Sequence, residues 1–205
     1  MANNFFNAIK TNISADASAP TTIYSPSAIK AIAIELDAAN KSSAGVTLTV
    51  SIEDNSANAS ATAVSIDDVT DAGNGVFTDN SHGLVVGDRL LFAFNTAPNI
   101  SSGSTDSALL NTKIYYVQAA DTNTFKIAET RNAGTPMKFS SVGASITYIK
   151  KAIADIVRDA PVPVGGALKV ISGQKLVLEA SDKLYAHCSS ANNVDVVASV
   201  LAEVS

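Results

Sequence analysis

Two histidines and one cysteine are the side chains of this sequence best suited to nucleophilic chemistry: His82, His187 and Cys188. Such chemistry pairs a serine or cysteine nucleophile with a histidine base. His187 and Cys188 are adjacent in an alternating, strand-like segment, and successive strand residues point to opposite faces, so they form no dyad. We therefore expect Cys188 to be a small buried hydrophobe rather than a reactive thiol. A single cysteine also has no partner for an intrachain disulfide.

Acidic residues occur in two pairs, Glu53-Asp54 and Asp67-Asp68, whose types suit acid–base or metal chemistry. Both pairs lie in polar stretches, where solvated carboxylates in turns are the usual interpretation. Residues 71–75 follow a calcium loop only in part, because the sixth-position Gly and the terminal Glu of an EF-hand are missing. Gly165-Gly166 is not followed by the Lys-Ser/Thr of a phosphate-binding loop. The sequence thus predicts no catalytic, cofactor-binding or metal-binding residue, and no enzyme.

The composition favours contacts between proteins. Hydrophobic residues make up 46% of the chain and charged residues only 16%, against about 25% in typical soluble domains. Short neutral side chains cost little entropy when a contact orders them, so we expect protein partners, including further copies of this chain. The formal net charge of −5 and a single adjacent basic pair, Lys150-Lys151, argue against a nucleic-acid partner. No apolar run approaches the ~18 residues of a membrane helix, and residues 1–10 lack a signal-peptide pattern, so we expect no membrane partner and synthesis in a cytoplasm.

Strand signals dominate, because apolar residues recur at every second position. Residues 29–37 and 46–52 alternate in this way around a polar turn at 40–45, which predicts a hairpin with one buried face. The end of the chain has the same pattern in four short segments separated by polar turns: 168–171, 175–178, 183–188 and 195–204. Both faces of the last segment are partly apolar, which indicates a central strand.

Composition also divides the chain into domains. A polar linker at 54–60 and the basic pair near 150 enclose residues 60–149, which have their own strands and most of the aromatic side chains. The flanking parts, 20–59 and 150–205, are predicted to form one antiparallel β-sandwich of six to eight strands. Residues 153–163 are expected to pair with the strand that ends near Glu53. The predicted fold is therefore all-β, an antiparallel β-sandwich with an inserted small β-barrel domain.

Residues 1–19 are predicted to be an N-terminal arm. Within them, residues 3–11 suit a short helix, because Phe5, Phe6 and Ile9 share a helical face. The alternative is a free arm that docks onto a neighbouring subunit.

The inserted segment carries a motif of eight residues that we expect to be structural: His82, Gly83, Gly87, Asp88, Tyr115, Tyr116, Asn123 and Phe125. The two glycines would permit positive φ in a tight strand entry, and Asp88 would accept backbone N–H groups in the turn. We interpret His82 as a turn-packing residue rather than a metal ligand, since no second ligand lies at a suitable spacing. The motif resembles a small β-barrel module of phage structural and tail proteins. That module is similar to the first catalytic-cysteine half-domain fold of ubiquitin-activating enzymes, without their catalysis.

The flanking parts carry a second resemblance. Thr22-Ile23-Tyr24 and the phrase DAPVPVGGALKVISGQKLVLEASD at 159–182 resemble small virion proteins of marine and cyanobacterial tailed phages. The resemblance implies a virion structural protein, assembled in the host bacterial cytoplasm and bound to capsid or tail subunits. A decoration protein on the exterior of capsid or tail is the first expectation. The alternatives are a neck, baseplate or fibre-junction component, or an adhesin for a host receptor or glycan. The absence of Trp speaks against a sugar site.

Overall fold

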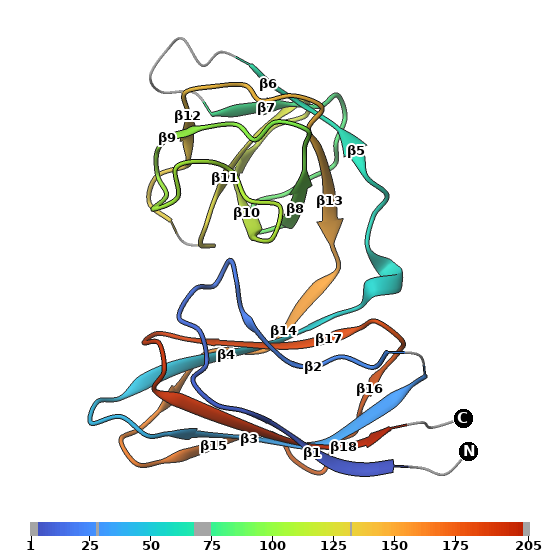
Figure 1. The fold of residues 1–205 in the computed structure, drawn as a ribbon, viewed down its shortest axis with the longest axis vertical. Helices are drawn as coiled ribbons and strands as arrows, with labels where there is room; N and C mark the ends of the chain where they lie inside the picture. The colour runs from blue at the N-terminus through green and yellow to red at the C-terminus, as the bar shows by residue number, and fades with distance from the viewer. Residues whose placement is uncertain (1–3, 28, 68–74, 132, 203–205) are drawn as a thin grey trace. The chain divides into compact units, whose positions relative to one another are not determined.

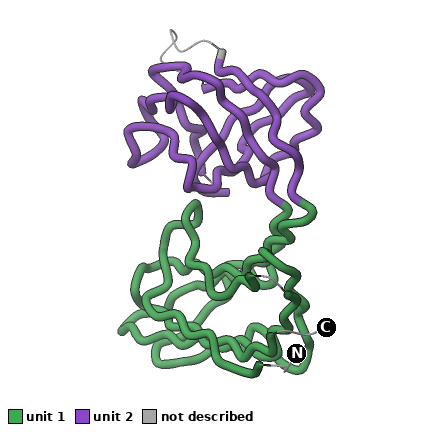
Figure 2. Tube along the Cα trace, turned by 45° about the vertical axis from the view of Figure 1, so that its right-hand side comes forward, with its two compact units in different colours: residues 1–57, 152–205 green, residues 58–151 purple. Residues whose placement is uncertain are grey.

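The computed structural model describes residues 4–27, 29–67, 75–131 and 133–202, and nearly all of its regular structure is β. The predicted all-β class is confirmed. The chain divides into two compact units, which Figure 2 shows in different colours. We call residues 1–57 and 152–205 the discontinuous unit, and residues 58–151 the inserted unit. The insertion predicted from the sequence covered residues 60–149. No helix among the described residues is long and apolar enough to cross a membrane.

The discontinuous unit is a sandwich of two antiparallel sheets (Figure 1). The first sheet has the order β1-β18-β3-β15, and β16 pairs with β3 beside β15. Its strands are β1 (Asn4–Lys10), β18 (Val194–Ala202), β3 (Ala31–Asn40), β15 (Ala167–Ile171) and β16 (Leu176–Leu178). The second sheet has the order β14-β4-β17-β2. Its strands are β14 (Ile153–Val162), β4 (Val46–Glu53), β17 (Lys183–Cys188) and β2 (Thr21–Tyr24).

This strand order is that of a jelly roll. When β15 and β16 are counted as one interrupted strand, the eight strands of the unit fall into sheets 1-8-3-6 and 5-4-7-2, the double Greek key of that fold. The inserted unit lies in the chain between the fourth and fifth strands, β4 and β14. These two strands pair directly with each other, beginning with Ile153 opposite Glu53. The pairing predicted for residues 153–163 is therefore confirmed.

The core of the sandwich consists of the inward residues of both sheets. Alternate positions of β3, β4 and β18 are fully or almost fully buried, as the period-two pattern requires. Leu36, Leu48 and Val196 are examples with no exposed surface. β18 lies between β1 and β3, the central place that its two partly apolar faces predict.

Two local predictions for this unit are wrong. Residues 29–37 and 46–52 do not form a hairpin, because β3 belongs to the first sheet and β4 to the second, and the turn between them crosses from one layer to the other. Among the described residues, 4–19 are also not a separate arm, and 4–11 contain no helix. Asn4–Lys10 form β1, which pairs with β18 over its whole length because the edge of that strand is open to receive it.

The inserted unit is a curved antiparallel sheet with the order β5-β13-β8-β10-β11-β7-β6. Its strands are β5 (Thr62–Ala63), β13 (Thr147–Lys151), β8 (Arg89–Ala93), β10 (Ile114–Ala120), β11 (Thr124–Ala128), β7 (Val76–Thr78) and β6 (Ser65–Asp67). The sheet forms a half-barrel, and its two end strands β5 and β6 are separated only by Val64. A small ladder of β9 (Ile100–Ser102) and β12 (Lys138–Phe139) accompanies it. A 3-10 turn, η1 (Asn55–Ala57), follows β4.

The core of the inserted unit is aromatic. Phe77 lies at its centre, stacked on Phe125 at 5.1 Å between ring centroids and edge-on to Phe139 at 5.5 Å. Phe92 and Tyr148 complete the group and are almost fully buried. Such ring pairs add specific contacts to the burial of large apolar surfaces, so this unit has a hydrophobic core of its own.

Candidate interaction surface

The histidine of the inserted motif packs in a turn. The Nδ1 atom of His82 accepts a hydrogen bond from Leu84 N–H at 2.9 Å, and its Nε2 atom lies 3.2 Å from Thr124 O. A ring with its proton on Nε2 would make both contacts, since a carbonyl oxygen only accepts. The ring also meets Phe125 edge-on. His82 thus joins its turn to β11.

The next residues of the motif shape the entry into β8. Gly83 and Gly87 have φ values of +64° and +94°, which favour glycine. A Cβ atom on Gly87 would lie 2.8 Å from Nη2 of Arg131. Asp88 Oδ2 accepts a hydrogen bond from Val85 N–H at 2.9 Å and lies 2.7 Å from Lys150 Nζ. The carboxylate therefore closes the turn and ties it to β13.

The two tyrosines of the motif hold the half-barrel together. Tyr115 has no exposed surface, and its hydroxyl accepts a hydrogen bond from Leu110 N–H at 2.9 Å. Burial raises the pKa of Tyr115 to about 12. The guanidinium of Arg89 lies 5.5 Å from the ring centroid of Tyr116, within the range of a cation–π contact.

Asn123 and Phe125 complete the motif. Asn123 Oδ1 accepts a hydrogen bond from Ser81 N–H at 3.2 Å, and Asn123 O accepts one from Asp79 N–H at 2.9 Å. Phe125 is part of the aromatic core. The structure therefore places all eight motif residues in turns and core contacts of the inserted unit rather than around a shared open site.

The thiol and the second histidine do not meet on one face. Cys188 is buried in the core of the discontinuous unit, and its Sγ lies 3.0 Å from Ser190 O. Burial raises the pKa of the Cys188 thiol, which disfavours the thiolate needed for nucleophilic attack. His187 is half-buried on the opposite face of β17, in register with Thr49.

The acidic pairs have different surroundings. Hydrogen bonds from the Ser56 hydroxyl and from Ala57 N–H lower the pKa of Asp54, which closes the turn after β4. Asp68 and residues 71–74 of the partial calcium loop lie outside the described residues. Within the described ranges, no group of three or more His, Cys, Asp or Glu residues could hold a metal ion.

A polar ladder that sequence reasoning missed crosses the second sheet. Glu53 has no exposed surface, and its Oε2 accepts a hydrogen bond from the Tyr185 hydroxyl at 2.6 Å, with Lys183 Nζ 4.0 Å away. Ser51 Oγ donates to Asp155 Oδ1 at 2.7 Å on the same face of β4. Burial and the hydrogen bond to Glu53 raise the pKa of Tyr185 far above its ordinary range. The Tyr185 hydroxyl therefore keeps its proton at neutral pH and donates it in a hydrogen bond to the buried side chain of Glu53.

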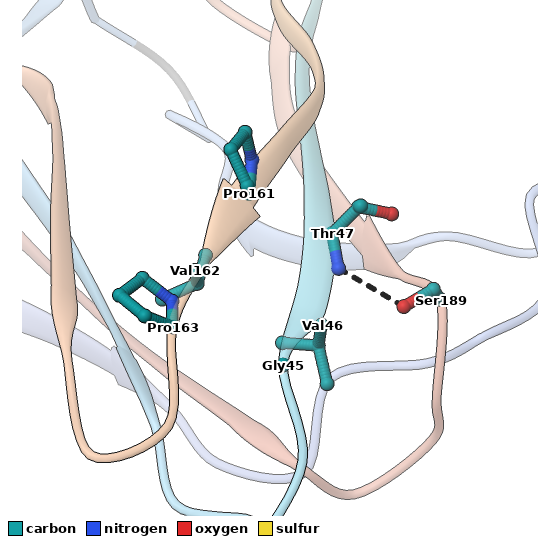
Figure 3. A pocket seen from close by; sticks show the side chains of 7 residues that line it. All are labelled: Gly45, Val46, Thr47, Pro161, Val162, Pro163 and Ser189. Carbon is teal, nitrogen blue, oxygen red and sulfur yellow. Dashed lines mark hydrogen bonds between the residues drawn. The ribbon is translucent and has the colours of Figure 1, made fainter.

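An apolar groove of about 490 Å³ lies where β4 begins and β14 ends (Figure 3). It is lined by Gly45, Val46, Thr47, Pro161, Val162, Pro163 and Ser189. At its margin Thr47 N–H donates a hydrogen bond to Ser189 Oγ at 3.0 Å, and Ser189 N–H donates one to Thr47 O at 2.9 Å. With aliphatic walls and neither a charged group nor an aromatic ring among its lining residues, the groove has the chemistry to receive an aliphatic group, and it lacks the aromatic platform of a sugar site.

The outer face of the first sheet carries a continuous apolar row. Phe5 on β1 faces Leu201 on β18, Leu201 faces Ile32 on β3, and Ile32 faces Val177 on β16. Phe5 is 61% exposed and Val177 52%, while the two central residues are half-buried. A second exposed pair on the same face, Ile9 and Val197, lies further along the same two strands, beyond the hydrogen-bonded polar pair Asn7 and Ser199. We call the four residues of the row and this second pair the apolar face.

Charged residues lie on the same outer face of the sheet, and Asp37 on β3 is directly opposite Val197. Lys169 on β15 lies 2.7 Å from Glu35 Oε1 and 4.0 Å from Asp37 Oδ1 on β3. Asp195 on β18 pairs with Lys41 at 2.8 Å. The apolar face is therefore bounded by ion pairs, the arrangement of an interface core beside a polar rim.

No protein-family model, no curated protein and no solved structure matches the chain.

Proposed function

We propose that this chain is a structural protein of a bacteriophage virion, most simply an accessory or decoration protein on the exterior of the capsid or tail, which acts by binding other protein subunits. The observation that carries the proposal is the apolar face. Isolated exposed apolar residues are ordinary on protein surfaces, whereas a row of apolar side chains across four adjacent strands, from Phe5 to Val177, is typical of an interaction site.

Energetics favour burial of this face. Removing apolar surface from water contributes roughly 25 cal/mol per Å², and Phe5, Ile9 and Val177 each expose more than half of their surface. Only 16% of the chain is charged, so charge repulsion between subunits is weak. A modest contact of this kind becomes stable when it is repeated over a symmetric particle.

The virion assignment rests on two further supports. Residues 159–182 and the motif of the inserted unit resemble phage structural proteins, as described above. The jelly-roll order of the discontinuous unit occurs in viral capsid domains, and also in lectins and cupins. Fold alone does not specify function. The jelly-roll order is therefore compatible with the proposal, and the physical argument for it comes from the apolar face.

The test is the number of copies per purified particle, measured by quantitative mass spectrometry on virions of the phage that encodes the chain. Hundreds of copies are expected for a decoration protein. Six, twelve or another small ring multiple would favour the neck, baseplate or fibre-junction alternative. Absence of the chain from washed particles would refute a virion role.

A binding experiment tests the surface itself. Particles assembled without the chain are incubated with purified variants, and the bound fraction is measured after sedimentation. Val177→Lys places a charge within the apolar face and is expected to lower binding at least tenfold. Ala39→Lys places the same charge at an exposed position of β3 outside the apolar face and is expected to bind like the unchanged chain. Equal binding by the two variants would exclude the apolar face as the contact.

A further inference from the structure

Three of the four sheet edges in the discontinuous unit are protected against pairing with another strand. β14 contains Pro161 and two register shifts. β2 is only four residues long and has a shift in its pairing with β17. On the far edge of the first sheet, β15 has a register shift and the charged Lys169, and β16 has only three residues. Proline, bulges, charge and shortness are the usual means of blocking an edge.

The fourth edge, β1, has none of this protection along its centre. Its seven residues pair with β18 in one unbroken register, from Asn4 opposite Ala202 to Lys10 opposite Val196. The strand contains no proline, and Lys10, at its end, is its one charged residue. In the part of the chain that the structure describes, no strand pairs with its other side. A long, regular, uncharged edge of this kind is a template for strand addition.

We propose that β1 pairs antiparallel with β1 of a second copy of this chain, around a two-fold axis at Asn7. This inference rests on the proposed assembly role and names one partner of the chain, which binds at the β1 edge. In this register Phe5 faces Ile9 of the other copy, Phe6 faces Ala8, and Asn4 faces Lys10. Every apolar residue of the strand then meets an apolar residue, and the two Lys10 side chains lie at opposite ends of the pair.

The sequence of β1 supports the antiparallel arrangement in particular. A parallel pairing in register would place Lys10 beside Lys10, and like charges directly opposite each other destabilise a sheet. The two-fold arrangement is isologous, so one surface patch serves both subunits and the contact closes at two copies. It also makes the two first sheets continuous, so that Phe5 and Ile9 of both copies form one extended apolar surface.

The test compares two double variants of the full chain by sedimentation velocity over a range of concentrations. In the proposed register, F5K/I9K places lysine opposite lysine at both cross-strand positions. F5K/I9E places lysine opposite glutamate at the same positions. Both variants change the same two residues, each 61% exposed, so circular dichroism should show the same folded spectrum for both.

The unchanged chain is expected to form a dimer, and F5K/I9K is expected to dimerise at least about tenfold more weakly than F5K/I9E. This difference should shrink in high salt, because exposed charges are screened. A monomeric unchanged chain, or equal self-association by the two variants, would overturn the strand pairing. A monomer that is abundant in particles would overturn this inference alone, whereas a dimer absent from particles would overturn the virion role alone.

Discussion

Replacing Tyr185 with Phe should lower the free energy of unfolding of the discontinuous unit by about 2 kcal/mol. The Tyr185 hydroxyl donates a 2.6 Å hydrogen bond to Glu53, a carboxylate with no exposed surface. Hydrogen bonds to charged groups contribute roughly 1.5–3 kcal/mol. Phe keeps the ring in place, and Lys183 Nζ remains 4.0 Å from the same oxygen, so the middle of this range is expected.

Urea unfolding at pH 7, followed by far-UV circular dichroism, measures this loss. Each unit has a hydrophobic core of its own and can unfold in its own transition, so a matched control is needed to assign the transitions. Tyr148→Phe removes a comparable 2.6 Å hydrogen bond to Asp79 in the inserted unit and should shift a different transition. A loss below about 0.5 kcal/mol for Tyr185→Phe, within the range of ordinary surface substitutions, would show that the buried carboxylate does not depend on this donor.

Two further predictions concern pH and the insertion. Burial raises the pKa of Tyr115 to about 12, so the unfolded chain loses this proton first as the pH rises above about 10, and roughly 3 kcal/mol of stability should be lost between pH 10 and pH 12. Urea unfolding at pH 8 and pH 11.5 should show a smaller decline for Tyr115→Phe than for the unchanged chain, and equal declines would contradict this assignment. Replacing residues 58–151 with a short Gly-Ser bridge should leave a folded discontinuous unit, because Asp54 N–H already donates to Ala152 O at 3.0 Å across the gap. A bridged chain that is insoluble or lacks a cooperative unfolding transition would show that the sandwich needs the insertion.

The amino-acid sequence by itself was sufficient for the all-β class. Alternation of apolar residues reports which side of a strand is buried, and this is a local property. Positive φ at Gly83 and Gly87 and the closure of their turn by Asp88 are equally local, because only a few neighbouring residues determine them.

The local pattern does not determine which strands pair with each other. The pattern of residues 29–37 and 46–52 is the same whether the two strands pair with each other or cross between layers, and the hairpin prediction was therefore wrong. The segment that contains Phe5, Phe6 and Ile9 suits one face of a helix as well as an edge strand. Pairing with β18 decided between them, because the ladder supplies backbone hydrogen bonds along the strand.

Only the tertiary structure created the surfaces on which the proposals rest. Phe5 and Leu201 are neighbours in the sheet although they lie near opposite ends of the chain, and Glu53 meets Tyr185 in the same way. Alternation shows that Phe5 and Val177 belong to strands, but it does not show that Leu201 and Ile32 join them into one row. The sequence therefore determined which residues are suited to burial, whereas the order of the strands decided which of them remained exposed together, because strand order depends on pairing between distant segments.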